Sequence, residues 1–167
     1  MTVQGKNSLA GTYSGAGIGV EKDATLVITE QSTGSLKAVG GACGAAGIGG
    51  KAGSTGYEGR KLETGTIIIK GGTIEAEGGA YWVYAYNYHG GAGIGTGLYG
   101  IGGTIEILGG RITAAGGRET GAGIGGGAGG SVDKIVIGGA RGKAPDITVS
   151  SYNNCLLYTS DAADDLT

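Results

Sequence analysis

The sequence predicts an all-β protein whose fold is a parallel β-helix, or β-solenoid, of about four right-handed coils with three strands each. Three observations lead to this prediction. A glycine-rich phrase recurs along the chain, short β-branched runs recur before it, and glycine supplies 42 of the 167 residues. Because so much glycine is costly to order, a fold that uses it must need tight turns or close backbone approach.

The recurring phrase is Gly-Ala-Gly-Ile-Gly, with alanine replacing the first glycine in one copy. The spacings between its isoleucines are 30, 46 and 30 residues, so the middle unit is longer than the others. These isoleucines are Ile18, Ile48, Ile94 and Ile124. A fixed recurrence of this kind is typical of stacked repeats, in which each unit covers the core of its neighbour.

Two apolar phrases precede each later copy, so a unit is expected to contain three strands separated by turns. Alternation along a strand sends every second side chain inward. The inward pairs expected in the first strand are Leu26/Ile28, Ile67/Ile69, Ile105/Ile107 and Ile135/Ile137. Those expected in the second strand are Leu36/Ala38, Ile74/Ala76, Ile112/Ala114 and Ile147/Val149. Those expected in the third are Ala16/Ile18, Ala46/Ile48, Ala92/Ile94 and Ala122/Ile124.

The repeat pattern divides the chain into one repeat domain, 1–152, and a short tail, 153–167. Insertions are expected at 51–64 and 80–90, where the unit is longer than its neighbours. The tail breaks the pattern, because the last thirteen residues contain no glycine. Residues 155–165 resemble a translated sequencing adapter of the kind found at the ends of metagenomic reading frames. The tail is therefore expected to be non-native or disordered, and the natural repeat array to be longer.

Residues 12–150 resemble a known group of repeats. Gly-Gly-Thr-Ile-x-x-x-Gly-Gly followed by Gly-Ala-Gly-Ile-Gly-Gly-Gly is similar to the glycine-rich β-helix repeats of large secreted or wall-attached bacterial proteins, some of them labelled carbohydrate-binding. The resemblance implies an extracellular or cell-surface location, with signal and anchor outside this chain. It implies architecture more than function, because these residues build the coil.

Charge and cysteine content exclude several classes of function. The formal net charge is −2 and no run of like charge exceeds two residues, so no nucleic-acid-binding surface is expected. No apolar stretch is long enough to span a membrane. Cys43 is expected to be a small core or turn residue, and neither a disulfide framework nor a cofactor is predicted.

The glycine-rich phrase also matches the nucleotide-binding pattern G-x-G-x-x-G at residues 121–126. Such a site needs one glycine turn between a strand and a helix, whereas this phrase recurs and no helical periodicity follows. A structural role is therefore preferred, with a column of side-chain-free positions facing outward at Gly17, Gly47, Gly93 and Gly123. A ligand, another element or a second copy would then lie against this flat face.

The strongest functional hint is the aromatic insertion within 80–90. Its candidate glycan-binding residues are Tyr81, Trp82, Tyr84, Tyr86, Tyr88 and His89. Exposed tyrosine and tryptophan rings stack on the apolar faces of sugars while their polar tips hydrogen-bond hydroxyl groups. The alternative is that the insertion folds down and covers apolar surface of its own coil. No metal site is expected, because the one histidine has no second histidine or cysteine pair beside it.

Two other surface features receive a structural interpretation. Glu75 and Glu77 are expected on one outer face, where paired carboxylates serve acid–base chemistry or calcium binding. Lys37 is expected to lie beside Glu75 as an ion pair, which favours a solvated face. A short outward column of threonines at the start of the first strands weakly suggests ice binding.

The residues together predict a non-enzymatic extracellular repeat module with a structural or adhesive role. Its partner is expected to be a polysaccharide or cell-surface glycan, held by the aromatic insertion. The alternative is a degenerate carbohydrate-active enzyme, similar to polysaccharide lyases on a β-helix scaffold. Self-association is a further expectation, through the open ends of the solenoid or through the glycine face.

Overall fold

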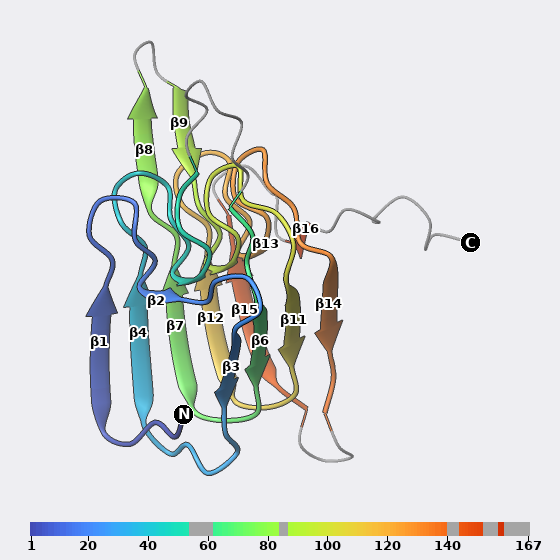
Figure 1. Ribbon diagram of the computed structural model, residues 1–167. Helices are drawn as coiled ribbons and strands as arrows, with labels where there is room; N and C mark the ends of the chain where they lie inside the picture. The colour runs from blue at the N-terminus through green and yellow to red at the C-terminus, as the bar shows by residue number, and fades with distance from the viewer. Residues whose placement is uncertain (54–61, 84–86, 140–143, 152–156, 159–167) are drawn as a thin grey trace.

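The computed structural model describes residues 1–53, 62–83, 87–139, 144–151 and 157–158. The chain is all-β, and no helix occurs within these ranges. Apart from one antiparallel hairpin, the strands belong to three sheets in which every neighbouring pair is parallel. Figure 1 shows these strands stacked side by side from the N-terminal to the C-terminal end of the molecule.

Three sheets form the body, and each takes its name from one of its central strands. The β7 sheet contains β1 (Lys6–Ala10), β4 (Ser35–Val39), β7 (Thr73–Glu77), β12 (Arg111–Ala115) and β15 (Asp146–Ser150), in that order. The β6 sheet contains β3 (Thr25–Ile28), β6 (Thr66–Ile69), β11 (Thr104–Ile107) and β14 (Lys134–Ile137). The β10 sheet contains β2 (Ile18–Gly19), β5 (Ile48–Gly49), β10 (Ile94–Gly95), β13 (Ile124–Gly125) and β16 (Leu157–Tyr158).

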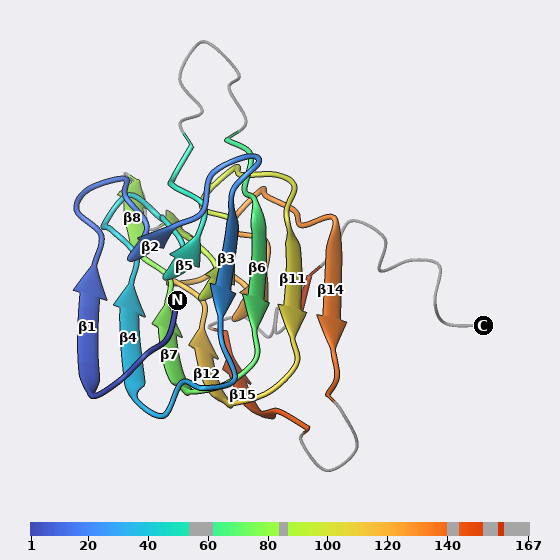
Figure 2. The ribbon, with the colours of Figure 1, turned by 60° about the horizontal axis from the view of Figure 1, so that its bottom comes forward.

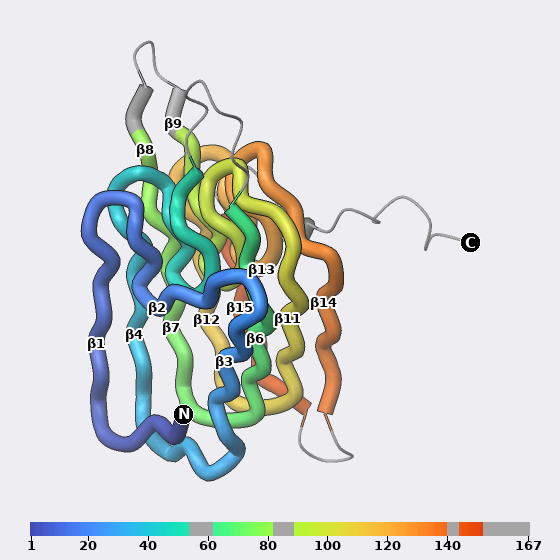
Figure 3. Tube along the Cα trace, viewed as in Figure 1, coloured from blue at the N-terminus to red at the C-terminus, as the bar shows by residue number. Residues whose placement is uncertain are grey.

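The chain visits the three sheets in a fixed order. Each turn supplies one strand to the β6 sheet, then one to the β7 sheet, then one to the β10 sheet. Figure 3 follows these successive turns along the tube, and Figure 2 shows the four strands of the β6 sheet side by side. The order and the parallel pairing are consistent with the predicted solenoid. A partial turn precedes the four complete ones: its β2 contains the predicted Ile18, whereas its β1 was not predicted.

The predicted inward columns form the core. The strand register pairs equivalent residues of successive turns, as at Leu36, Ile74, Ile112 and Ile147. The inward isoleucines of the middle turns are 0–1% exposed and belong to one continuous hydrophobic cluster. Several inward residues near the ends of the stack are only partly buried, because a neighbouring turn covers them on one side: Ile18, Leu26, Ile135, Ile147 and Val149. Ile137, which was also predicted to face inward, is 48% exposed on the last turn.

The glycine column predicted to face outward points into the molecule, so that prediction is wrong. A Cβ on Gly47 would lie 2.7 Å from the Glu77 nitrogen, and one on Gly93 would lie 2.8 Å from the Ala115 carbonyl oxygen. A Cβ on Gly17 or on Gly123 would likewise collide with the C-terminal end of a strand of the β7 sheet. The missing side chains therefore allow close approach between the third strands and the β7 sheet, and these four glycines do not form an outer face for a partner.

The last glycine of the recurring phrase has a different role. Gly49, Gly95 and Gly125 have φ values of 129°, 140° and 134°, a region that other residues rarely adopt. A Cβ on Gly95 would also lie 1.9 Å from the carbonyl oxygen of Gly125 on the next turn. Both conformation and space require glycine where the third strand ends.

The C-terminal segment contributes one short strand. In β16, Leu157 pairs with Ile124 and Tyr158 with Gly125. The predicted boundary between 152 and 153 lies outside the described residues, as does the rest of the segment apart from β16. That boundary stays a prediction.

Candidate functional site

The aromatic insertion forms an antiparallel hairpin at the corner between the β7 and β10 sheets. Its strands are β8 (Ala80–Val83) and β9 (Asn87–Gly90), and Figure 1 shows them extending from the stacked turns. The backbone register places Tyr81 opposite His89 and Trp82 opposite Tyr88. Tyr84 and Tyr86 lie outside the described residues, as do the side chains of Trp82 and Tyr88.

The hairpin lies between the β7-sheet strand and the β10-sheet strand of its turn, where the neighbouring turns have a connection of only three residues. The Gly91 N–H donates to the Gly79 carbonyl at 2.9 Å, which closes the base of the hairpin. On the following turn, the Gly121 N–H donates to the Gly117 carbonyl at 3.3 Å across residues 118–120. The body therefore continues past this corner without needing the hairpin, which is an addition to a repeating turn.

Residues of the next turn support the base of the hairpin. The Gly90 N–H donates to Thr120 Oγ1 at 3.1 Å, and the Gly90 carbonyl accepts from the Ala128 N–H at 2.8 Å. The His89 ring lies 6.3 Å from the Tyr99 ring, centroid to centroid, with the ring planes tilted by 52°. These contacts fix the direction in which the hairpin leaves the body.

A second, small hydrophobic cluster lies beneath this corner. It contains Ala45, Ala52, Leu98 and Ala128, with Cys43 and Tyr99 packed against it. Cys43 is a half-buried free thiol that lies in a turn, one of the two kinds of position predicted for it. Since Ala52 begins the other insertion and Tyr99 contacts His89, both insertions depart from the neighbourhood of this cluster.

Tyr81 and His89, which lie opposite each other in the hairpin, have different surroundings. Tyr81 is 42% exposed, whereas His89 is half-buried against Tyr99 and its Nδ1 has no hydrogen-bond partner within the described part of the chain. Each of the two alternatives from the sequence thus describes one of these residues. Tyr81 presents a ring to solvent, and His89 covers the body.

Sequence reasoning missed two aromatic residues near this corner. Tyr13 is 79% exposed, and its carbonyl accepts a hydrogen bond from the Cys43 N–H at 3.0 Å, one turn along the stack. Tyr99 lies under the hairpin through its contact with His89. Aligning the corner turns of successive units would have found Tyr13, because it occupies the connection that the hairpin replaces in the third unit.

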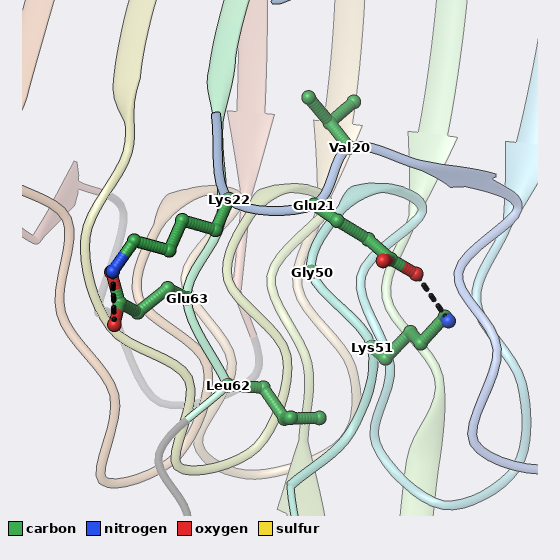
Figure 4. Close-up of a pocket in the computed structure, with 7 residues that line it drawn as sticks. All are labelled: Val20, Glu21, Lys22, Gly50, Lys51, Leu62 and Glu63. Atoms are coloured by element: carbon green, nitrogen blue, oxygen red, sulfur yellow. Dashed lines mark hydrogen bonds and ion pairs between the residues drawn. The ribbon is translucent and has the colours of Figure 1, made fainter. Parts of the chain in front are cut away.

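A hollow lies at a different corner, between the β10 and β6 sheets. It is a cavity of about 280 Å³ lined by Val20, Glu21, Lys22, Gly50, Lys51, Leu62 and Glu63. Figure 4 shows that Glu21 points to Lys51 on one side while Lys22 points to Glu63 on the other. The Lys22 Nζ to Glu63 Oε2 distance is 2.8 Å.

Each charge in this cavity is balanced by a neighbour. The pKa of Glu21 lies below its ordinary value, mainly because Lys51 donates a hydrogen bond to it and, second, because the positive charge of Lys51 attracts the carboxylate. The same two effects from Glu63 raise the pKa of Lys22. Carboxylates and ammonium groups held in these ionised states are poor proton donors and acceptors near neutral pH. The arrangement therefore favours a structural role for this corner.

The 51–64 insertion is only partly described. Tyr57, Glu58, Arg60 and Lys61, which the sequence places in a surface loop, lie outside the described residues. Glu63 is exposed and pairs with Lys22.

The paired carboxylates of β7 lie on its exposed face, as predicted. The register places Lys37 beside Glu75, and the two side chains form an ion pair. The hydrogen bond to Glu75 and then its charge raise the pKa of Lys37. Within the described ranges, no group of three or more His, Cys, Asp or Glu side chains is arranged to hold a metal ion.

The threonine column is short. Thr25, Thr66 and Thr104 are in register on the β6 sheet, and Lys134 takes the next position.

No protein-family model, curated protein or solved structure matches this chain. No helix of sufficient length and apolarity to cross a membrane occurs in the part of the chain that the structure describes.

Proposed function

We propose that the chain is a right-handed β-solenoid module of a cell-surface or secreted protein, with a non-enzymatic structural or adhesive role. More specifically, the module binds a polysaccharide or cell-surface glycan through the aromatic hairpin. The proposed contact residues are Tyr81, Trp82, Tyr84, Tyr86 and Tyr88, together with His89 at the base of the hairpin, where its half-buried ring also lies against Tyr99. The observation that carries the proposal is the replacement of a three-residue corner turn by an aromatic hairpin with an exposed Tyr81.

The physical case for glycan binding rests on ring chemistry and on a fixed support. The Tyr81 ring is accessible, and tyrosine combines an apolar face for C–H groups with a hydroxyl for polar contacts. The hairpin base is held by Gly90 and by the packing of His89 on Tyr99. A pre-ordered site loses less conformational entropy on binding, which favours affinity for a flexible ligand.

A glycan array tests this function. The wild-type chain is compared with a variant carrying alanine at Tyr81, Trp82, Tyr84 and Tyr86. Wild type is expected to bind a subset of glycans, and the variant is expected to lose that signal while keeping its unfolding transition. Equal signals from the two proteins, or no wild-type signal on any glycan, would contradict the proposal.

The alternative enzyme function has its own support and its own test. Glu75 and Glu77 lie on one exposed face of β7, where paired carboxylates are able to serve acid–base chemistry, while the ion pair between Lys37 and Glu75 is the arrangement of a solvated surface. Incubation with pectin-like polymers would reveal unsaturated products if the chain were a degenerate polysaccharide lyase. Product formation that disappears in a Glu75→Gln, Glu77→Gln variant would favour the enzyme over the binding module.

A further inference from the structure

Within the described part of the chain, the β7 sheet ends in two edge strands, and both carry exposed groups. There, β1 pairs only with β4, and β15 pairs only with β12. All five residues of β1 are exposed, including Leu9 at 45%. Parallel strands at an open edge present backbone donors and acceptors that a further strand can use.

At the N-terminal ends of the strands of this sheet, backbone hydrogen bonds form a series with one bond per turn. The N–H groups of Ser35, Thr73, Arg111 and Asp146 each donate to a carbonyl of the preceding turn, at 2.8–3.0 Å. Their acceptors are the carbonyls of Gly5, Gly34, Gly72 and Gly110. The register gives Lys6 as the equivalent donor on the first turn and Pro145 as the equivalent acceptor on the last.

A second series closes the other end of the same strands. The N–H groups of Gly11, Gly40, Gly78 and Gly116 donate to carbonyls of the following turn, at 2.8–3.0 Å. Their acceptors are Val39, Glu77, Ala115 and Ser150. By the same register, Ser151 supplies the next donor and Ala10 the next acceptor.

We propose that a second copy of this chain stacks head to tail on the first, with β15 of one copy pairing in parallel with β1 of the next. The register that continues both series places Asp146 opposite Lys6 and Val149 opposite Leu9. Opposite charges then meet at the outer face and apolar side chains meet at the inner face, which are the favourable cross-strand pairs. Ile147 lies opposite Asn7, the one unfavourable match in this row.

The β6 sheet supports the same stacking. Met1 runs beside β3, because its amino group donates to the Val27 carbonyl and its carbonyl accepts from the Thr29 N–H. Met1 therefore lies opposite Ile28, at the position that Ile137 occupies on the last turn. Met1 is 49% exposed and Ile137 is 48% exposed, and stacking brings them together. Their contact would remove apolar surface from water at the second sheet.

The contact joins two different surfaces, so it repeats and produces open linear chains. Each copy adds five strands to the β7 sheet, which corresponds to about 24 Å of length at the usual strand spacing. This goes beyond the proposed glycan binding, because it uses neither the hairpin nor its aromatic residues.

Sedimentation velocity over a dilution series tests the stacking, with the full chain at low ionic strength. The wild-type mass is expected to rise with concentration, and Lys6→Glu is expected to weaken association by roughly tenfold by placing a glutamate opposite Asp146. Lys70→Glu is the matched control, because Lys70 is exposed and the change in net charge is the same. It should associate like wild type.

A second variant protects the test against a folding defect. Adding Asp146→Asn to Lys6→Glu removes the repulsion while keeping a hydrogen-bonding group near Arg111, whose Nε lies 3.1 Å from Asp146. The double variant should recover part of the association. A wild-type chain that stays monomeric at every concentration would overturn the proposal. The proposal would also be overturned if the Lys6→Glu and Lys70→Glu variants associated equally strongly. A double variant that associates no more strongly than Lys6→Glu alone would overturn it as well.

Discussion

Gly95 ends the third strand of its turn with a φ of 140° and no room for a side chain. We expect Gly95→Ala to destabilise the fold by at least about 3 kcal/mol, because it combines backbone strain with a collision against Gly125. Gly19 is the matched control, because it follows the isoleucine of the same phrase, is exposed and would have no atom within 4 Å of an added Cβ.

Chemical denaturation measures both effects. Gly19→Ala should change the free energy of unfolding by about 0.5 kcal/mol or less. If the two alanine variants unfolded at the same denaturant concentration, the close backbone stacking at the third strand would be contradicted.

Glu21 gives a residue-scale prediction about pH. Its pKa lies below the ordinary value because Lys51 donates a hydrogen bond to it and attracts its charge. The pair therefore contributes to stability above the pKa of the unfolded chain, and this contribution is lost as the pH falls through the lower folded-state pKa. Because both side chains are exposed, the contribution is expected to be small and sensitive to salt.

An NMR titration of the Glu21 carboxyl carbon checks this assignment. Lys51→Met should raise the midpoint toward the ordinary glutamate value. Lys37→Met, which removes a different exposed ion pair, should leave the Glu21 midpoint where it is. A midpoint that does not move on Lys51→Met would show that Lys51 is not the cause of the lowered pKa.

Single residues also show where sequence reasoning fails. Alternation does not extend to Gly47 and Gly93, because the third strands are only two residues long and begin at the following isoleucine. The rule of alternating faces has no meaning before the strand begins. The contact between His89 and Tyr99 could not be predicted either, because it depends on how the hairpin base meets the connection that follows β10.

At the scale of strands, position within the stack decides how much an apolar side chain contributes. Ile107 and Ile137 are register partners on β11 and β14, with exposed fractions of 0% and 48%. We expect Ile107→Ala to cost about 2–5 kcal/mol, since it leaves a cavity in the core. Ile137→Ala should cost about 1 kcal/mol or less, because its side chain is half-exposed at the sheet edge.

Thermal or denaturant unfolding of the two variants measures this difference directly. Equal losses of stability would mean that β14 is covered as fully as β11. That result would contradict the open edge used in the stacking proposal.

Most strands could be predicted because the same register recurs in every unit. The columns through Ile74 and through Ile105 contain apolar residues at each repeat, which a single strand could not have established. β1 was missed because one of its two inward positions, Asn7, is polar and only Leu9 is apolar, so its sequence carries no alternating apolar signal. It is a strand because β4 offers it a parallel partner.

At the scale of the whole molecule, the body and the hairpin are separable structures. The body is a stack of equivalent turns, each covering the inward residues of the next. The hairpin replaces one corner turn and is closed at its base by Gly79 and Gly91. The sequence revealed the insertion and its aromatic content, but the spatial arrangement of the candidate site also depends on Tyr13 of another turn and on Tyr99, which follows β10.

The most direct test of a binding hairpin on an independent body exchanges the hairpin for the turn of the next unit. Residues 80–90 are replaced by Arg-Glu-Thr, the connection at 118–120, and the variant is examined by glycan array and thermal unfolding. We predict a cooperative transition close to that of wild type and complete loss of glycan binding. A variant that still binds the same glycans, or that no longer folds, would contradict a binding hairpin carried by an independent stack of strands.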